Sequence, residues 1–152
     1  MSAVLDSDGL VETHRGTIYP WHCDHMGHMN VMWYVGKFDE ATWHLLAGVG
    51  LSAAWLRDNA RGMVAADQRI AYQRELLAGE TVVVRSGILE VREKSIRFAH
   101  RMIEAEGGQT CAVTQLVGVH LDTASRKSCA LPPEIRERAV RAVTTMSLPW
   151  DR

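Results

Sequence analysis

One long run of apolar residues at helical spacing stands in a chain that is otherwise strand-like. From Val31 to about Gly48 the apolar positions recur three and four residues apart, at Val31, Tyr34, Val35, Phe38, Ala41, Thr42, Leu45, Leu46 and Val49. That spacing predicts an α-helix. The opposite side is unusually aromatic for a solvated face, with Trp33, Gly36, Lys37, Glu40, Trp43 and His44. A helix that is apolar on most sides is expected to be enclosed by the rest of its domain.

Glycines lie inside the predicted helix and at its end. Gly36 weakens the predicted helix by up to ~1 kcal/mol relative to alanine, so we expect a close backbone contact there. Gly48 and Gly50 end the helix in a way that is common at helix C-termini.

Strand-like stretches lie on both sides of this helix. A weak first strand is predicted over 11–19, and Pro20 ends its pairing because proline has no N–H to donate. A short helix is predicted over 52–59, and a terminal helix over 132–143. Between them we predict four strands, at 63–74, 81–92 (with a bulge at Ser86-Gly87), 95–105 and 110–122.

This order of elements predicts an α+β fold with an antiparallel sheet. The length of 152 residues fits a single domain, 1–152, in which residues 1–9 are expected to be frayed.

Composition limits the function classes. The net charge of −1 and the absence of a basic cluster argue against nucleic acid as a partner. Three cysteines, Cys23, Cys111 and Cys129, are odd in number and irregularly spaced, which argues against a disulfide framework and indicates a reducing compartment. The first ten residues lack the basic and apolar regions of a signal peptide, and no stretch approaches the ~20 apolar residues of a membrane span. We therefore expect a cytoplasmic protein with no membrane partner.

The turn just before the long helix combines a carboxylate with a helix start. Asn30 is a favourable N-cap residue, because its side-chain oxygen can accept an N–H group of the first helical turn. Asp24 precedes these N–H groups, where the helix dipole favours negative charge. The same N–H groups could hold a developing oxyanion on a carbonyl, so the pattern suits acyl transfer.

The motif Asp24-x-x-Gly27-His28-x-Asn30-x-x-x-Tyr34, followed by Phe38-Asp39-Glu40-Ala41, resembles the signature of the hotdog-fold acyl-CoA thioesterases of the 4-hydroxybenzoyl-CoA thioesterase type. The stretch 77–82 is similar to the family's entry into its long strands, so the resemblance covers most of the chain. It implies a curved five-stranded antiparallel sheet wrapped around one long central helix. It also implies a homodimer or homotetramer.

The resemblance further implies an activity: hydrolysis of an acyl-CoA thioester to a carboxylic acid and CoA. Asp24 takes the catalytic place, as nucleophile or as general base, and these two roles stay open. The first turn of the helix, around Asn30, Val31 and Met32, takes the place of the oxyanion hole. The positions implied to contact substrate are Gly27, His28, Asn30, Val31, Tyr34 and Glu40. No cofactor is expected, since CoA enters as part of the substrate.

Several alternatives remain beside this interpretation. Asp24 could only organise its turn through hydrogen bonds to the backbone. Glu40 is the second candidate for the catalytic carboxylate, although pairing with Lys37 or a strand arginine is the simpler role. His22, His25 and His28 lie near Cys23, but no second pair of ligands accompanies them, so we predict no metal site.

Two other function classes also remain. One is a hotdog hydratase or dehydratase that acts on acyl thioesters, and the other is a non-catalytic acyl-CoA-binding module. The acyl group is open as well: an aromatic lining suits an aryl or medium acyl chain, or a cationic one through cation–π contact.

Overall fold

The computed structural model describes residues 8–151, so the expectation for residues 1–7 lies outside the described part of the chain. The elements follow one another as β1 (Val11–Thr17), the 3-10 turn η1 (Pro20–His22), α1 (Val31–Gly48), α2 (Ala53–Asp58), β2 (Arg61–Tyr72), β3 (Thr81–Val91), β4 (Ser95–Glu104), β5 (Thr110–Asp122) and α3 (Pro133–Arg141). The predicted order is confirmed, and the first strand is two residues shorter than predicted because the chain turns into η1 at Pro20.

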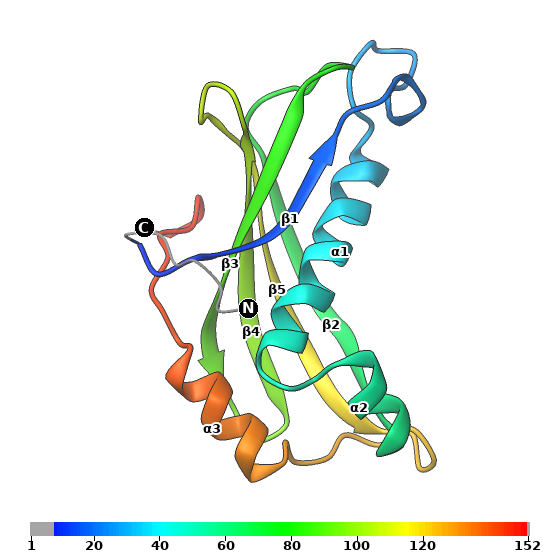
Figure 1. Cartoon of the computed structure of the whole chain (residues 1–152), viewed down its shortest axis with the longest axis vertical. Coiled ribbons are helices and arrows are strands. Elements are labelled where there is room, and N and C mark those ends of the chain that lie inside the picture. The colour runs from blue at the N-terminus through cyan, green and yellow to red at the C-terminus, as the bar shows by residue number, and fades with distance from the viewer. Residues whose placement is uncertain (1–7, 152) are drawn as a thin grey trace.

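The five strands form one sheet in the order β1-β3-β4-β5-β2, and each neighbouring pair is antiparallel. The α1 helix runs along one face of this sheet, while α2 and α3 lie at the opposite end of the molecule from η1 (Figure 1). The predicted α+β fold, with a five-stranded antiparallel sheet around a long helix, is confirmed. Among residues 8–151, no helix combines the length and apolar composition that crossing a membrane requires.

The core lies between α1 and the sheet. Around the first half of α1, Tyr34, Phe38 and Ala41 pack in a buried cluster with residues of β3 and β4 such as Val84 and Met102. Around the second half, Leu45, Leu46 and Val49 pack in a cluster with Ile88, Phe98 and Leu116, and with Ile135 of α3. Each Å² of apolar surface removed from water contributes roughly 25 cal/mol, so this burial is the main interaction that holds α1 against the sheet.

The outer face of the sheet has a smaller apolar cluster. Leu148, in the segment after α3, is buried against Ala99 and Val113. Arg69 from β2 stacks over the ring of Trp150 at 4.6 Å. The C-terminal segment therefore covers part of the face that α1 leaves open.

Four buried side chains form a chain of hydrogen bonds between the sheet and α1. The Thr13 hydroxyl lies 2.7 Å from that of Ser86, which lies 2.5 Å from Nδ1 of His100, and Nε2 of His100 lies 2.8 Å from the Thr42 hydroxyl. Thr42 donates to the Phe38 carbonyl at 3.0 Å. Its hydroxyl must therefore accept from His100 Nε2–H, which leaves Nδ1 to accept from Ser86. Every member is satisfied with His100 neutral.

Three expectations about α1 were wrong. The helix is not enclosed within residues 8–151, because Val31 is 54% and Val35 is 38% exposed. Lys37, predicted on the outer side, is buried, and its Nζ donates to the Thr17 carbonyl of β1 at 3.4 Å. A Cβ on Gly36 would meet nothing within 4 Å, so no close contact exists there.

The irregularity in β3 also differs from the prediction. Ser86 and Gly87 pair in regular register with His100 and Ala99, and the register shift falls between Ile88 and Glu90. Gly87 instead allows a close approach by the segment after α3, because a Cβ there would lie 2.7 Å from Cγ2 of Thr144.

Candidate active site

The turn before α1 is a small closed hairpin. The backbone of Asp24 accepts from Gly27 N–H at 3.0 Å, and Asp24 N–H donates to the His28 carbonyl at 3.2 Å. Gly27 has φ +85°, a conformation that glycine adopts without strain. An isolated antiparallel bridge between Cys23 and Met29 closes the hairpin at its base. The predicted turn glycine and the predicted carboxylate are thus parts of one rigid unit.

Both oxygens of the Asp24 carboxylate accept hydrogen bonds. Oδ1 accepts the N–H of Met26 at 2.9 Å, and Oδ2 accepts the side-chain amide of Asn30 at 2.8 Å. The Asn30 bond, then the Met26 bond, lower the pKa of Asp24 below its ordinary value. The carboxylate is therefore ionised at neutral pH and held beside the helix start. It does organise its turn, and it is also placed to act as a nucleophile or base.

The helix start has an open N–H group beside this carboxylate. Asn30 caps α1 as predicted, because its Oδ1 accepts Met32 N–H at 2.9 Å. Asn30 N–H itself donates to the His22 carbonyl. Of the three predicted oxyanion donors, the Val31 N–H is thus the one with no acceptor among the described residues. Since the helix N-terminus favours negative charge, this N–H can donate a hydrogen bond to an anionic oxygen.

The other predicted contact residues are spread along α1. His28 lies in the turn, with Nε2 at 3.4 Å from Oε1 of Glu75. Tyr34 is 4% exposed, and its hydroxyl donates to the Arg74 carbonyl at 3.2 Å, so it is a core residue under the site. Glu40 lies ten residues beyond Asn30, about 15 Å along the helix axis. It faces Nε2 of His14 at 3.4 Å, and within residues 8–151 it forms no direct ion pair with an arginine or with Lys37, whose charge it senses from farther away.

An aromatic cluster, made up of Tyr19, Trp21, His22 and Trp33, flanks the hairpin. Tyr19 and Trp21 stack with centroids 4.5 Å apart, and His22 lies 4.6 Å from Trp33 on the first turn of α1. Trp21 is 66% exposed. Trp33 was among the aromatic residues noted on the predicted helix, whereas Tyr19 and Trp21 were missed, although the stretch Tyr19-Pro20-Trp21 lies just before the turn.

Exposed apolar side chains surround the same hairpin. Met26 in the turn, and Val31 and Met32 at the start of α1, are each more than half exposed, and so is Trp21. Exposed apolar side chains that gather in one patch mark binding or interaction sites in soluble proteins. The ionised carboxylate, the open helix N–H and the apolar surroundings thus meet at one end of α1.

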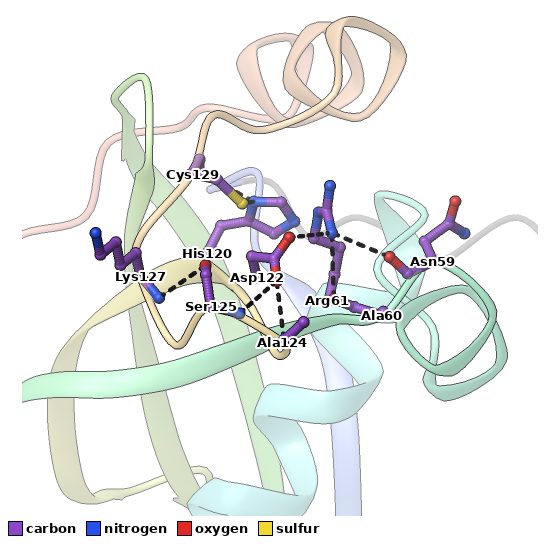
Figure 2. A network of polar contacts seen from close by, with 9 residues as sticks. All are labelled: Asn59, Ala60, Arg61, His120, Asp122, Ala124, Ser125, Lys127 and Cys129. Carbon is purple, nitrogen blue, oxygen red and sulfur yellow. Dashed lines mark hydrogen bonds and ion pairs between the residues drawn. The ribbon is translucent and has the colours of Figure 1, made fainter.

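A second polar network lies at the far end of the sheet and takes no part in this site (Figure 2). Asp122 accepts from Arg61 at 2.9 Å and from the N–H groups of Ala124 and Ser125. His120 Nδ1 lies 3.0 Å from the Cys129 carbonyl and 3.4 Å from its Sγ. A carbonyl only accepts, so Nδ1 carries the proton and cannot serve as base for the thiol. The network holds a turn in place.

Metal ligation was weighed for the histidines near Cys23. Throughout residues 8–151, no three His, Cys, Asp or Glu side chains gather closely enough to hold a metal ion. His22 instead accepts the Tyr19 N–H through Nδ1 at 3.0 Å, and burial lowers the pKa of its imidazole.

Comparison with known families identifies the fold. Residues 18–139 match the model of the Thioesterase-like superfamily. The chain belongs to this superfamily. The family assignment and the hotdog fold predicted from the turn motif are both confirmed.

Relatives of this superfamily member include betainyl-CoA thioesterases. It is 26% identical over 131 residues to the L-carnitine dehydrogenase/betainyl-CoA thioesterase of Agrobacterium fabrum, covering 86% of this chain and 27% of that protein. It is 22% identical over 129 residues to the betainyl-CoA thioesterase of Pseudomonas aeruginosa, covering 85% and 81% of the two chains. The chain thus spans about a quarter of the length of the bifunctional relative.

Solved structures show the same fold. A hypothetical protein of Staphylococcus aureus in complex with CoA superposes with a TM-score of 0.85 at 19% identity, covering 99% of this chain and 94% of that one. A 1,4-dihydroxy-2-naphthoyl-CoA thioesterase from Synechocystis gives 0.74 at 17% identity, with 84% and 93% covered.

Proposed function

We propose that this superfamily member hydrolyses an acyl-CoA thioester to a free carboxylic acid and CoA, with Asp24 as the catalytic carboxylate. The observation that carries the proposal is the coupling of Asp24 to the start of α1 through Asn30, at 2.8 Å. A thioester carbonyl at the helix start would have an ionised carboxylate on one side and an open N–H on the other.

The chemistry follows from these two groups. As nucleophile, Asp24 attacks the thioester carbonyl, CoA leaves as thiolate, and water then cleaves the mixed anhydride. As general base, Asp24 takes a proton from water, which attacks the same carbonyl. In both routes the carbonyl oxygen gains negative charge that the Val31 N–H and the helix dipole stabilise. An oxyanion donor of this kind is typically worth ~2.7–4 kcal/mol in the transition state.

The acyl group we propose is small and cationic, of the betainyl type. The support is the aromatic cluster beside Asp24, whose Trp21 ring is largely exposed, together with the names of the relatives. A quaternary ammonium over a Trp or Tyr ring gains ~0.5–2 kcal/mol. A betainyl group places its ammonium one methylene from the carbonyl, so both ends would lie beside the hairpin.

We also propose that the active unit is a homo-oligomer. The strands β1 and β2 are the edges of the sheet, and β2 runs over 12 residues with Val64 44% exposed. A long edge strand with apolar side chains is a ready template for pairing with a second chain. Sedimentation velocity at several concentrations tests this, and a species of monomer mass throughout would refute it.

The test of function is thiol release from betainyl-, butyryl-, octanoyl- and benzoyl-CoA by wild type, Asp24→Asn and Glu40→Gln. We expect wild type to hydrolyse at least one of these thioesters. Asp24→Asn should lose at least ~10²-fold in kcat, which corresponds to about 2.7 kcal/mol. Glu40→Gln should keep kcat within about threefold of wild type. Equal rates for wild type and Asp24→Asn would overturn the role of Asp24.

Two further outcomes separate the alternatives. Binding of acyl-CoA without thiol release would make the chain a binding module, and hydration of crotonyl-CoA would make it a hydratase. In a single turnover in oxygen-18-labelled water, label found in the Asp24 carboxylate demonstrates the nucleophilic route. The nucleophilic route places the label in the Asp24 carboxylate when water attacks the anhydride at that carbon, whereas the general-base route never labels Asp24.

A further inference from the structure

A cavity lies along the C-terminal half of α1, away from the hairpin. It has a volume of about 630 Å³ and is lined by β1, the C-terminal half of α1, β3, Arg141 at the end of α3 and residues 142–144 after it. The lining residue His44 on α1 is 14 positions beyond Asn30, about 21 Å along the helix axis. Pockets that hold small molecules usually measure about 300–1,000 Å³, so this one is of ligand size.

The cavity is not a continuation of the acyl site. Between the two, the groove of β1 and α1 is crossed by Lys37, whose Nζ donates to the Thr17 carbonyl, and by the pair of His14 and Glu40. An apolar acyl chain running from the hairpin would have to pass these polar groups. A ligand in this cavity would therefore be separate from an acyl group at the hairpin.

The inner walls of the cavity favour an apolar body. Leu45, Val49 and Ile88 line it from α1 and β3, and each is buried in the protein. Thr13 and Ser86 also line it, but their hydroxyls are used in the chain of hydrogen bonds that ends at His100 and Thr42. The walls thus leave no polar group that a ligand must satisfy, and they come from rigid elements.

The rim favours one anionic group. Arg141 lines the cavity with a side chain that is 70% exposed, and among residues 8–151 its one ion pair is with Glu137 at 3.7 Å, too long for a hydrogen bond. Its donors are therefore free to form a fork with a carboxylate. The acidic residue on the rim, Glu12, is already paired with Arg15.

We propose that this cavity binds a monocarboxylic acid with an apolar body, its chain among Leu45, Val49 and Ile88 and its carboxylate on Arg141. The site is separate from the hairpin and independent of whether Asp24 cleaves thioesters. Octanoate is the probe, with octanol as the neutral analogue.

The chain offers a matched pair of filling variants. Gly48 lines the cavity and Gly36 does not, and at both positions of the same helix a Cβ would meet no heavy atom within 4 Å. Gly48→Leu should therefore occupy the cavity, while Gly36→Leu adds the same side chain elsewhere. Both replace glycine inside a helix, which favours folding.

The experiment follows the backbone amides of the full chain by NMR during titration with octanoate. For wild type and Gly36→Leu we expect saturable shifts at Gly9, Gly87 and Thr144, which border the cavity. Gly48→Leu should weaken binding at least tenfold. Arg141→Gln should weaken octanoate at least tenfold and leave octanol unchanged.

Other outcomes would overturn the proposal. These are the absence of saturable shifts in wild type, shifts confined to the hairpin around Gly27, or equal affinity in Gly48→Leu and wild type. Equal loss of octanoate and octanol in Arg141→Gln would remove the carboxylate from the proposal. None of these readouts depends on thiol release, so failure here and failure of the thioesterase proposal are distinguishable.

Discussion

Asn30 donates its side-chain amide to the Asp24 carboxylate over 2.8 Å while its own side-chain oxygen caps α1 by accepting Met32 N–H over 2.9 Å. One residue thus fixes the helix start and the candidate catalytic carboxylate relative to each other. The hydrogen bond from the Asn30 side chain is also the largest cause of the lowered pKa of Asp24. These two roles can be separated by substitution.

Asn30→Ser should keep the cap and lose the bond to Asp24, because serine caps helices well but lacks the amide donor. We expect the pKa of Asp24 to rise, so the acid limb of kcat/KM against pH moves to higher pH than in wild type. The melting temperature should stay close to wild type. Asn30→Ala loses the cap as well, and should lose a further ~1 kcal/mol of stability in urea. Identical acid limbs in wild type and Asn30→Ser would show that Asn30 does not tune Asp24.

The buried His100 predicts how stability depends on pH. Burial lowers the pKa of His100 from 6.5 to about 3. Between these values the unfolded chain binds a proton that the folded chain excludes, so the free energy of unfolding falls as pH drops below 6.5. The slope from this residue is at most about 1.4 kcal/mol per pH unit.

Urea unfolding at pH 7.5, 6.0 and 5.0 tests this with His100→Gln, which cannot titrate. We expect the variant to be less stable than wild type at pH 7.5, since it cannot bridge Ser86 and Thr42 as imidazole does. Its stability should fall less steeply with pH, so the two curves converge toward pH 5. Burial also lowers the pKa of His14, and that contribution is common to both proteins. Parallel curves would contradict the assignment.

Two glycines give opposite predictions for the same change. Gly87→Ala should destabilise by about 1–3 kcal/mol, because its Cβ would lie 2.8 Å from Cδ2 of buried Leu10 and 2.7 Å from Thr144. Gly36→Ala should stabilise by up to ~1 kcal/mol, since the helix gains propensity and nothing lies within 4 Å. Midpoints of urea unfolding measure both. A stabilised Gly87→Ala would mean that the C-terminal segment does not sit over β3.

What the sequence could predict was largely local. The Asn30 cap and the bounds of α1 follow from neighbouring residues, so they were correct. The burial of Lys37 was not predictable, because its charge reaches the Thr17 carbonyl from another element, and the spacing of apolar residues carries no information about such a partner. The same holds for His14 as the partner of Glu40. Trp21 was missed because it belongs to no periodic element, although it lies three residues before Asp24.

The exposed ring of Trp21 predicts how the substrate is selected. Betainyl-CoA and 3,3-dimethylbutyryl-CoA have acyl groups of nearly the same shape, and one carries a quaternary nitrogen where the other has a carbon. If the ammonium lies over Trp21, Trp21→Leu should raise KM for betainyl-CoA by about 3–30-fold, which corresponds to ~0.7–2 kcal/mol. The KM for the neutral isostere should change by less than about twofold, and kcat for both should be similar to wild type. Trp43→Leu, which alters an exposed Trp further along α1, is the matched control and should leave both values unchanged. An equal rise in KM for both substrates would show that Trp21 contributes shape rather than cation–π attraction, and the cationic acyl class would then lose its main physical support.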